Sequence, residues 1–296
     1  MELVNVLMST YNGEKYIKEQ LDSILHQSYH NLRIYVRDDG SSDGTLDILE
    51  RYHRENKIIL LKGDNVGYGS SFMQLLALAD EGEYWAFSDQ DDIWDSGKIS
   101  RSVNKLSKMK KTEPNMYYHS YELTDEKMNV IGKSRAPIPN YSFQMAITEC
   151  FHLGFATVIN KELRELMLKG NASNIISHDW WAELIAMEFG NIYCDKYIGA
   201  KHRRLEESVS SSSLKSRVRW FFKALKGNSE IQSLTLSFCD TFETEMDKKD
   251  RRILLWFVSE RYSFIKSLKK CFYYRRWRTS LASEFVVRFL MLAGKI

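Results

Sequence analysis

Short apolar runs alternate with segments of helical periodicity at the start of the chain. The apolar runs have the length and composition of buried strands, and they fall at residues 3–8, 32–36, 58–61 and 84–87. Between them, apolar positions recur at helical spacing, which predicts helices within residues 14–28, 45–52 and 72–79. This alternation, with short polar connections, predicts an α/β fold in which helices cover both faces of a mainly parallel sheet.

Polar loops follow three of these strands, at residues 10–12, 38–39 and 89–92. In open α/β sheets the loops that follow parallel strands meet at the carboxyl edge, where ligands bind. A single loop rich in Asp, Gly and Ser is usually only a turn. Three such loops at one edge indicate a ligand site.

The loop after the fourth strand is acidic, with Asp89, Asp91 and Asp92 directly behind an apolar run. Carboxylates this close repel one another, and burying one without a partner costs several kcal/mol, so we expect a cation between them. Hard oxygen ligands favour Mg²⁺ or Mn²⁺. The alternative is a solvated loop in which Asp92 or Asp95 caps the next helix.

Composition is that of a packed globular protein, since the 296 residues are 44% hydrophobic and include only three Pro. The first residues predict a strand and not a signal peptide. No apolar run has the length of a membrane span, because the best one, residues 285–293, is short and contains Arg288. Four Cys without CxxC spacing predict core thiols in a reducing cytosol.

Charge divides the chain into two parts. Residues 201–296 contain 21 Lys and Arg against 10 Asp and Glu, a net charge of +11, so the total of +3 leaves −8 for residues 1–200. Within the basic part, residues 214–226 and 269–278 place Lys and Arg beside aromatic residues, after a Ser run at 210–213 that predicts a hinge. Helices of this composition bind the bilayer interface. The alternatives are a packed bundle with a solvated basic face, and nucleic-acid binding, which no recognisable motif supports.

Three segments in order, residues 6–13, 38–45 and 88–94, resemble the motifs of family 2 glycosyltransferases of GT-A fold, and most closely those of bacterial rhamnosyltransferase-like enzymes of polysaccharide biosynthesis. The resemblance implies a Rossmann-like catalytic domain over residues 1–205 and a basic, helical, membrane-associating region over 206–296. It further implies an inverting enzyme, cytoplasmic and peripheral at the inner face of the cell membrane. The donor would be dTDP-rhamnose first or a UDP-hexose second, and the acceptor a growing cell-surface polysaccharide on a polyprenyl lipid.

Two other classes of protein remain as alternatives. The first is a non-catalytic scaffold that keeps this fold within a membrane assembly for polysaccharide synthesis. The second is a nucleotidyltransferase, which would carry a phosphate loop rich in Gly, Arg or Lys near the first strand. That loop is absent, as is the GxGxxG motif of a dinucleotide-binding domain.

The resemblance gives roles to the residues at the predicted edge. Tyr11 would stack on a pyrimidine base, with Thr10 and Asn12 beside it, unless Tyr11 merely packs under its own loop. Asp39 would accept a hydrogen bond from the imide N–H of the base, because a carboxylate is an acceptor and that edge offers one donor. Its neighbour Asp38 is expected to be structural.

Residues 89–91 match the DXD element of the family. Asp91 would be the main ligand of Mg²⁺ or Mn²⁺, Asp89 would lie near the ribose or the metal, and Asp92 would support them. The metal would neutralise the charge that develops on the leaving nucleoside diphosphate.

An inverting transfer also needs a base for the acceptor hydroxyl. The resemblance places Asp179 in that role, with Trp180 and Trp181 as a wall for a sugar ring and Gly154 where the backbone approaches the sugar. The alternative is that Asp179 only N-caps a helix over residues 180–188. The neighbouring His178 is expected to be structural.

The sequence departs from the family pattern after the last strand. The family's histidine falls on Leu205 in this chain. Either His202 replaces it from a shifted register, or Arg203 and Arg204 supply the positive charge on the donor phosphates.

Overall fold

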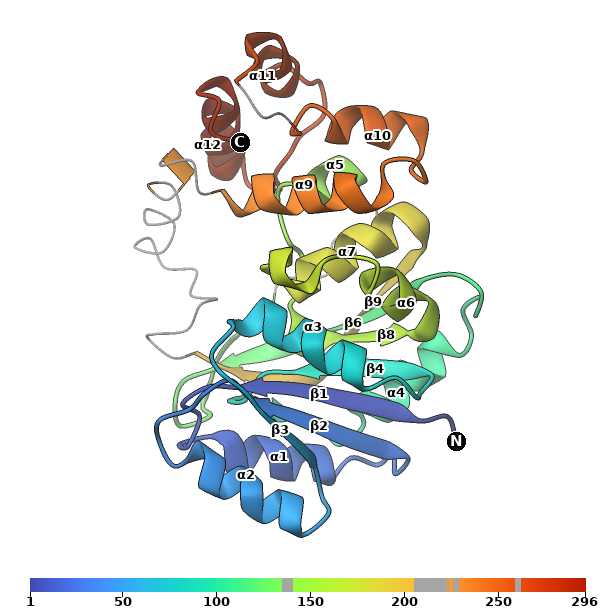
Figure 1. The fold of residues 1–296 in the computed structure, drawn as a ribbon, viewed down its shortest axis with the longest axis vertical. Helices are drawn as coiled ribbons and strands as arrows, with labels where there is room; N and C mark the ends of the chain where they lie inside the picture. The colour runs from blue at the N-terminus through green and yellow to red at the C-terminus, as the bar shows by residue number, and fades with distance from the viewer. Residues whose placement is uncertain (135–140, 205–221, 223, 226–228, 259–261) are drawn as a thin grey trace.

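A computed structural model describes residues 1–134, 141–204, 222, 224–225, 229–258 and 262–296. Figure 1 shows a layered α/β part with a group of helices at one end. The predicted hinge at 210–213, most of the basic segment 214–226 and Leu205 lie outside the described residues.

The first half of the chain confirms the predicted alternation of strands and helices. Its elements are β1 (Val4–Thr10), α1 (Ile17–Leu25), β2 (Leu32–Asp38), α2 (Thr45–Arg54), β3 (Ile59–Lys62), α3 (Tyr68–Leu78) and β4 (Tyr84–Ser88). The four strands pair in parallel in the order β3-β2-β1-β4. Their carboxyl ends therefore meet at one edge, as the sequence predicts.

Beyond β4 the sheet becomes mixed. The elements here are β5 (Ile93–Trp94), α4 (Lys98–Leu106), β6 (Asn115–Thr124), β7 (Val130–Lys133), α5 (Phe143–Ala146), η1 (Gly154–Ala156), β8 (Thr157–Asn160), α6 (Lys161–Met167), η2 (Ala172–Asn174), α7 (His178–Phe189) and β9 (Asn191–Arg203). The full order is β3-β2-β1-β4-β8-β6-β9-β5, with β7 on β6. Because β8 is antiparallel to both β4 and β6, and β9 is parallel to β6, the ends of β6 and β9 return to the carboxyl edge of β4.

Strand periodicity explains why helices cover both faces. Val4, Val6 and Met8 of β1 pack with α1, α2 and α4 on one face, whereas Leu7 packs with α3, α6 and α7 on the other. Successive side chains of a strand point to opposite faces, so a continuous apolar strand such as β1 needs cover on both.

The C-terminal helices extend one of these two cores. They are α9 (Glu230–Phe242), α10 (Lys248–Leu254), α11 (Phe264–Cys271) and α12 (Leu281–Leu292), and they lie beyond α7 at the end of the molecule away from α2 (Figure 1). Trp181 of α7 contacts Phe238 and Phe242 of α9, and Thr148 donates a hydrogen bond to the carbonyl of Trp277 at 2.6 Å. The described helices thus pack on the α/β part. No helix in the described ranges is long and apolar enough to cross a membrane.

Candidate active site

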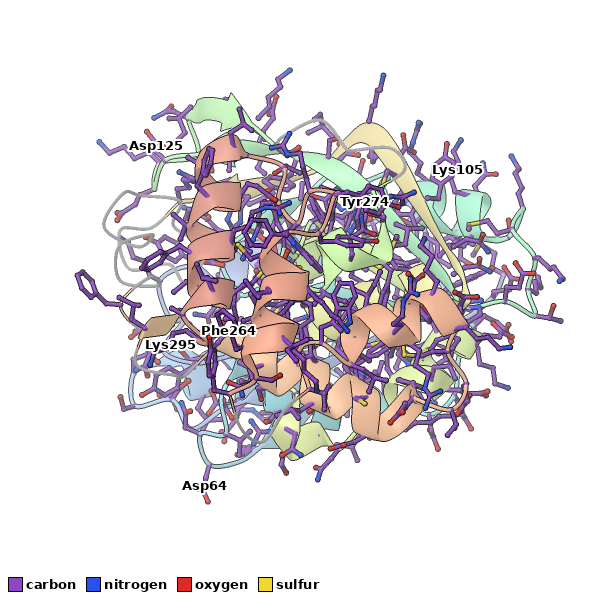
Figure 2. All side chains as sticks on the ribbon, turned by 90° about the horizontal axis from the view of Figure 1, so that it is seen from above. Asp64, Lys105, Asp125, Phe264, Tyr274 and Lys295 are labelled. Carbon is purple, nitrogen blue, oxygen red and sulfur yellow. The ribbon has the colours of Figure 1, made fainter. Side chains whose placement is uncertain are left out.

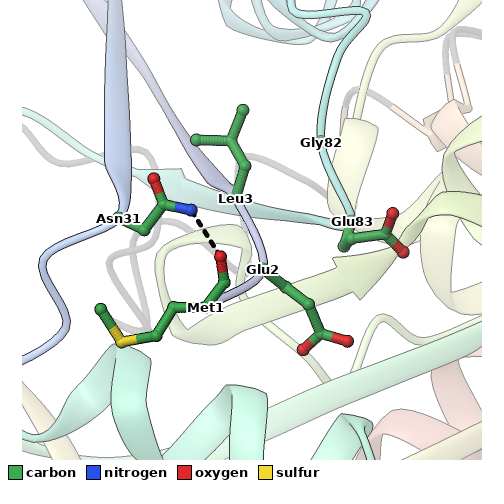
Figure 3. Close-up of a pocket in the computed structure, with 6 residues that line it drawn as sticks. All are labelled: Met1, Glu2, Leu3, Asn31, Gly82 and Glu83. Atoms are coloured by element: carbon green, nitrogen blue, oxygen red, sulfur yellow. Dashed lines mark hydrogen bonds between the residues drawn. The ribbon is translucent and has the colours of Figure 1, made fainter.

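The predicted loops converge at the carboxyl edge of the sheet. Thr10 at the end of β1 is the register partner of Asp38 at the end of β2, and Met8 is the partner of Ser88 at the end of β4. On the far side, Thr124 pairs with Arg203 where β6 and β9 end. By contrast, the pocket in Figure 3, lined by Glu2, Asn31 and Glu83 among others, lies at the opposite edge, where these strands begin.

Gln90 joins the first loop to the acidic loop. The hydroxyl of Thr10 donates to Gln90 Oε1 at 2.7 Å, and the Tyr11 N–H donates to the same oxygen at 2.9 Å. The Gln90 amide returns a hydrogen bond to the Tyr11 carbonyl at 3.1 Å. Sequence reasoning treated Gln90 only as the spacer between two carboxylates and missed this role.

The first loop leaves the Tyr11 ring exposed. Asn12 accepts a hydrogen bond from the Ser42 N–H at 2.8 Å and donates its own N–H to Ser41 Oγ at 2.9 Å, which ties the loop to the one after β2. Thr10 is buried, whereas the Tyr11 side chain is 48% exposed. Tyr11 is therefore not packed under its loop, and its stacking on a base stays a prediction.

Asp39 is buried and hydrogen-bonded. Its carboxylate pairs with Arg37 and accepts the backbone N–H groups of Val66 and Gly67, both at 3.0 Å. It thereby fixes the loop between β3 and α3 at the site edge, and its contact with a base stays a prediction. Asp38 accepts the N–H and hydroxyl of Ser41 at 3.0 and 2.6 Å, which is the structural role expected of it.

Asp92 is the fully buried member of the acidic loop. Its Oδ1 accepts hydrogen bonds from His202 Nδ1 at 2.8 Å and from the Arg203 N–H at 3.2 Å, while its buried Oδ2 has no partner among the described residues. The alternative in which Asp92 caps the next helix is wrong, because it bonds to β9 and α4 begins after Gly97. Asp95 accepts the Gly97 N–H at 2.9 Å and does not cap α4 either.

Asp89 and Asp91 carry poorly compensated charge. Burial and then the Asp92 charge raise the pKa of Asp91 to about 6, and burial, Asp92 and Asp91 raise the pKa of Asp89 well above its usual range. Neither side chain has a hydrogen-bond or ion-pair partner on another of the described residues, whereas Asp92 accepts two hydrogen bonds. Fixed carboxylates that lack donors attract a cation.

These carboxylates fit a divalent cation only in part. They are the oxygen ligands that Mg²⁺ and Mn²⁺ prefer, and the partnerless Asp92 Oδ2 lies in the same loop. Over the described part of the chain, however, no three His, Cys, Asp or Glu side chains are grouped so that they alone could hold a metal ion. A cation here would need further oxygen ligands, and Mg²⁺ sites commonly take these from substrate phosphates and water.

The last strand supplies two side chains that brace the acidic loop. His202 stacks on Phe155, with ring centroids 4.6 Å apart, and although burial opposes protonation, its hydrogen bond to Asp92 raises its pKa. Arg203 donates to the Asp91 carbonyl at 3.0 Å and to Glu19 Oε2 at 2.6 Å. Arg203 is thus engaged within the protein, and its contact with donor phosphates stays a prediction.

Asp179 lies in the first turn of α7. Its carboxylate accepts the Gly154 N–H at 3.1 Å, the Trp180 N–H at 2.9 Å and the Ser177 hydroxyl. The N-cap of α7 is Ser177, so the alternative of Asp179 as an N-cap is wrong. Burial and the charges of Asp92 and Asp91 raise the pKa of Asp89 most, and the Asp179 charge adds to this rise, so the two carboxylates are near enough to interact electrostatically.

The predicted tryptophan wall is wrong. Trp180 and Trp181 are buried, and their indole N–H groups donate to the carbonyls of Ala146 at 2.6 Å and Met167 at 3.1 Å. Helical spacing on α7 turns both rings into the core. His178 is structural as expected, since it packs on Phe72 and burial lowers its pKa to about 4.

The sequence model of the family described as Glycosyl transferase family 2 matches residues 5–167, more than half of the chain. The chain belongs to this family. The match includes the three loops of the site edge and ends before Asp179.

Two curated relatives show the activities that are named within this family. The dTDP-rhamnosyl transferase RfbG of Shigella flexneri is 31% identical over 186 residues, which cover 59% of this chain and 63% of that protein. The UDP-Glc:alpha-D-GlcNAc-diphosphoundecaprenol beta-1,3-glucosyltransferase WfgD of Escherichia coli is 28% identical over 220 residues, covering 73% and 83%. The chain thus spans less than two thirds of the length of RfbG.

Solved structures establish the GT-A fold of this chain. S. aureus TarS 1-349 aligns with a TM-score of 0.61 at 14% identity, over 99% of this chain and 81% of that one. The mannosyltransferase PcManGT from Pyrobaculum calidifontis, in complex with GDP-Man and Mn2+, aligns with a TM-score of 0.58 at 17% identity, over 99% and 74%. The mixed sheet beyond β4 is therefore shared with enzymes of this fold.

Sequence reasoning missed two residues near the candidate site. Lys98 is fully buried, donates to the Phe155 carbonyl at 2.6 Å and lies 3.2 Å from the centre of the Trp94 ring. Burial lowers the pKa of Lys98 well below its usual range. Tyr68, at the start of α3, lies edge-on to His178 and near Asp179, whose charge adds to burial in raising the pKa of Tyr68. Helical periodicity alone gave no signal for either residue.

Proposed function

We propose that this glycosyltransferase moves a sugar from a nucleoside diphosphate to a polysaccharide acceptor with inversion at the transferred sugar. The observation that carries the proposal is the pairing of two unlike acidic groups at one edge of the sheet. Asp89 and Asp91 have raised pKa values and few partners, whereas Asp179 opposite them is positioned by three hydrogen-bond donors. Asp89 and Asp91 suit a bound diphosphate with its cation, and Asp179 suits a base held in a fixed position.

The donor base would lie against Tyr11 at the ends of β1 and β2. The exposed ring of Tyr11 offers a stacking face, and Asp39 offers a carboxylate to an imide N–H beside Thr10 and Asn12. We take dTDP-rhamnose as the first donor and a UDP-hexose as the second. RfbG is named as a dTDP-rhamnosyl transferase and WfgD as an enzyme that uses UDP-Glc, which supports both.

A divalent cation would be held by Asp91 and Asp89 together with the donor diphosphate. Mg²⁺ or Mn²⁺ in that position supplies positive charge to the leaving group, and PcManGT was solved with Mn2+ and GDP-Man. Asp92, His202 and Arg203 keep the acidic loop in place through their mutual hydrogen bonds.

Asp179 would take the proton from the acceptor hydroxyl. As that oxygen bonds to the anomeric carbon, the bond from the carbon to the diphosphate breaks on the opposite side, and the proton passes to the carboxylate. The Gly154 N–H, the Ser177 hydroxyl and the Trp180 N–H hold the carboxylate in a fixed direction. A Cβ at position 154 would lie 2.4 Å from His178 Nε2, so Gly154 lets its own N–H reach Asp179.

The acceptor in this proposal is a growing cell-surface polysaccharide on a polyprenyl lipid, at the inner face of the cell membrane. The name of WfgD specifies a diphosphoundecaprenol-linked acceptor. Such an acceptor would require the enzyme to work at a membrane surface, on the cytoplasmic side in this proposal.

A panel of donors tests this function on the purified full chain. In the presence of Mn²⁺ we expect dTDP-rhamnose or a UDP-hexose to release its nucleoside diphosphate slowly as the sugar passes to water in place of the acceptor hydroxyl, and we expect a chelator to abolish that release. A thermal shift with the same donors reports binding independently of turnover, because a ligand of the native state alone raises its stability. Absence of both binding and release across the panel would overturn the proposal in favour of a non-catalytic scaffold.

A further inference from the structure

Large apolar side chains are exposed along one side of α11 and α12. Leu281 and Phe285 of α12 are four residues apart and hence on one helix face, and they are 66% and 74% exposed. Phe264 and Ile265 at the start of α11 are also exposed, and Figure 2 looks down on these two helices. Soluble proteins seldom expose so many large apolar groups together without a partner for them.

The connection between the two helices presents two further aromatic rings. Phe272 and Tyr274 are 76% and 78% exposed, whereas Tyr273 between them packs against Trp256 and Trp277. This alternation turns every second ring outward. We call the exposed side chains together the α11–α12 face, made up of Phe264, Ile265, Phe272, Tyr274, Leu281 and Phe285.

Arg288 holds this connection in one conformation. Its guanidinium donates to the carbonyls of Cys271, Tyr273 and Arg275, and it also pairs with Glu284 at 2.6 Å. One partly buried ion pair thus anchors the backbone from which the exposed rings project. The outward rings are therefore a built feature of the fold.

The charge carried by this stretch of the chain is almost entirely positive, although Asp250 of α10 lies near Arg275. Residues 262–296 contain eight Lys and Arg and one acidic residue, Glu284, and Glu284 is buried against Arg288. Lys269, Arg275 and Arg276 are exposed among the aromatic residues. No acidic side chain in this stretch is left at the surface to oppose an anionic partner.

We infer that the α11–α12 face docks on an anionic lipid bilayer. Aromatic and aliphatic side chains insert at the boundary of headgroups and acyl chains, while Lys and Arg next to them meet anionic headgroups. Two copies of this chain would place like charges against one another, and a nucleic acid would leave the apolar groups unsatisfied. The inference deepens the proposed function, which puts the acceptor at a membrane, and it assigns that contact to residues on α11, on α12 and in their connection.

Flotation of the full chain with vesicles tests the inference without using the transfer reaction. We expect the protein to float with phosphatidylcholine vesicles that also contain phosphatidylglycerol, and much less with phosphatidylcholine alone. The double variant Phe272→Ser with Phe285→Ser, and separately Arg275→Gln with Arg276→Gln, should each reduce partition by roughly tenfold. The matched control is Val130→Ser with Ile131→Ser, which removes exposed apolar groups from β7 and should float like the wild type.

Three outcomes would overturn the inference. The first is equal flotation of the Phe272/Phe285 variant and the wild type. The second is a wild-type protein that is a dimer by light scattering and never floats, together with a Phe272/Phe285 variant that is a monomer. That result would mean that the α11–α12 face binds a second copy of the chain. The third is retention on duplex DNA without any flotation. Donor binding and release, measured on the same samples, separate these results from a failure of the proposed enzyme activity.

Discussion

The acidic loop after β4 and the helix α7 both carry carboxylates next to the site, yet their surroundings are opposite. At Asp89 and Asp91, neighbouring acids and burial raise the pKa. On α7, one oxygen of Glu183 accepts the N–H groups of Phe151 and His152 at 2.9 and 3.1 Å and the His152 ring at 3.0 Å. A carboxylate that accepts hydrogen bonds from the protein stabilises the fold, whereas a carboxylate without hydrogen-bond donors has oxygens free to bind a ligand.

The two kinds of acid also cooperate. Glu183 lies one helical turn after Asp179 and holds residues 151–152, and the chain then reaches Gly154, whose N–H donates to Asp179. Through Oε2 the Glu183 carboxylate therefore fixes the segment that orients the proposed base, while its buried Oε1 has no partner among the described residues. Substitutions at the two places should separate activity from stability.

The largest effect is expected for the proposed catalytic carboxylates. Asp179→Asn should lower transfer by roughly 10²–10⁴-fold while donor binding persists, because only the proton acceptor is lost. Asp91→Asn should lower it by roughly 10²-fold or more and also remove the effect of Mn²⁺ on donor affinity. Without added metal, Asp91→Asn should leave the free energy of unfolding equal or higher, since it relieves repulsion from Asp92. Steady-state kinetics and donor titrations check these results.

Asp80→Asn is a matched control for these variants. Asp80 is exposed after α3, at the opposite edge of the sheet, so we expect wild-type transfer. Unimpaired transfer by Asp179→Asn would remove the base assignment, and a marked loss of stability in Asp91→Asn would mean that the acidic loop is structural.

The next effect is on stability. Glu183→Gln keeps the shape of the side chain but removes its charge from the buried His152, and it should lower the free energy of unfolding by roughly 2–4 kcal/mol. Burial opposes protonation of His152, but Glu183 raises its pKa to about 9. The folded pKa is thus above the unfolded value, so this stabilisation is complete below about pH 6.5 and is lost as the pH rises through about 9.

Denaturant unfolding between pH 6 and 10 measures this effect. The wild type should lose stability across the range, and Glu183→Gln should show a flatter profile. Glu165→Gln on α6 is the control, because that side chain is 60% exposed and should change stability by less than about 0.5 kcal/mol. Equal pH profiles for Glu183→Gln and the wild type would show that the ion pair does not set the stability of this region.

Local pattern was enough to predict the first half of the fold and the meeting of three loops. Apolar runs with covered faces, such as β1, leave few alternatives to a parallel sheet. The loop residues could be placed because each lies at the end of a strand: Thr10 and Asp38 are the last residues of β1 and β2, and Asp89 directly follows β4. Strand direction beyond β4 could not be predicted in this way, because the reversal at β8 depends on contacts between distant segments.

The direction in which side chains point was the other feature that could not be predicted from the sequence. Trp180 and Trp181 follow Asp179 directly, and sequence adjacency suggested that all three face the sugar. Helical geometry separates neighbouring residues by about 100°, which turns both indoles into the core while Asp179 faces the edge. The partners of Asp92 and Lys98 come from β9 and from the residues around η1, so they too are visible only once the chain is folded.

The smallest effect on stability is expected at Glu188, which has one hydrogen-bond donor. It is intermediate between Asp89 and Asp91, which have none, and Glu183, which has several. Glu188 near the end of α7 accepts the Asp247 N–H at 2.7 Å where the C-terminal helices pack on α7, and burial raises its pKa to about 7. A carboxyl whose folded pKa exceeds its unfolded value costs stability when ionised, so stability should fall as the pH rises from about 4.5 through 7. Glu188→Gln keeps the hydrogen bond and should gain about 1 kcal/mol at pH 8 but nothing at pH 4.5. Thermal unfolding at both pH values measures this effect, with exposed Glu245→Gln as the control. If Glu188→Gln is less stable than the wild type at pH 8, the one backbone donor does compensate the Glu188 charge.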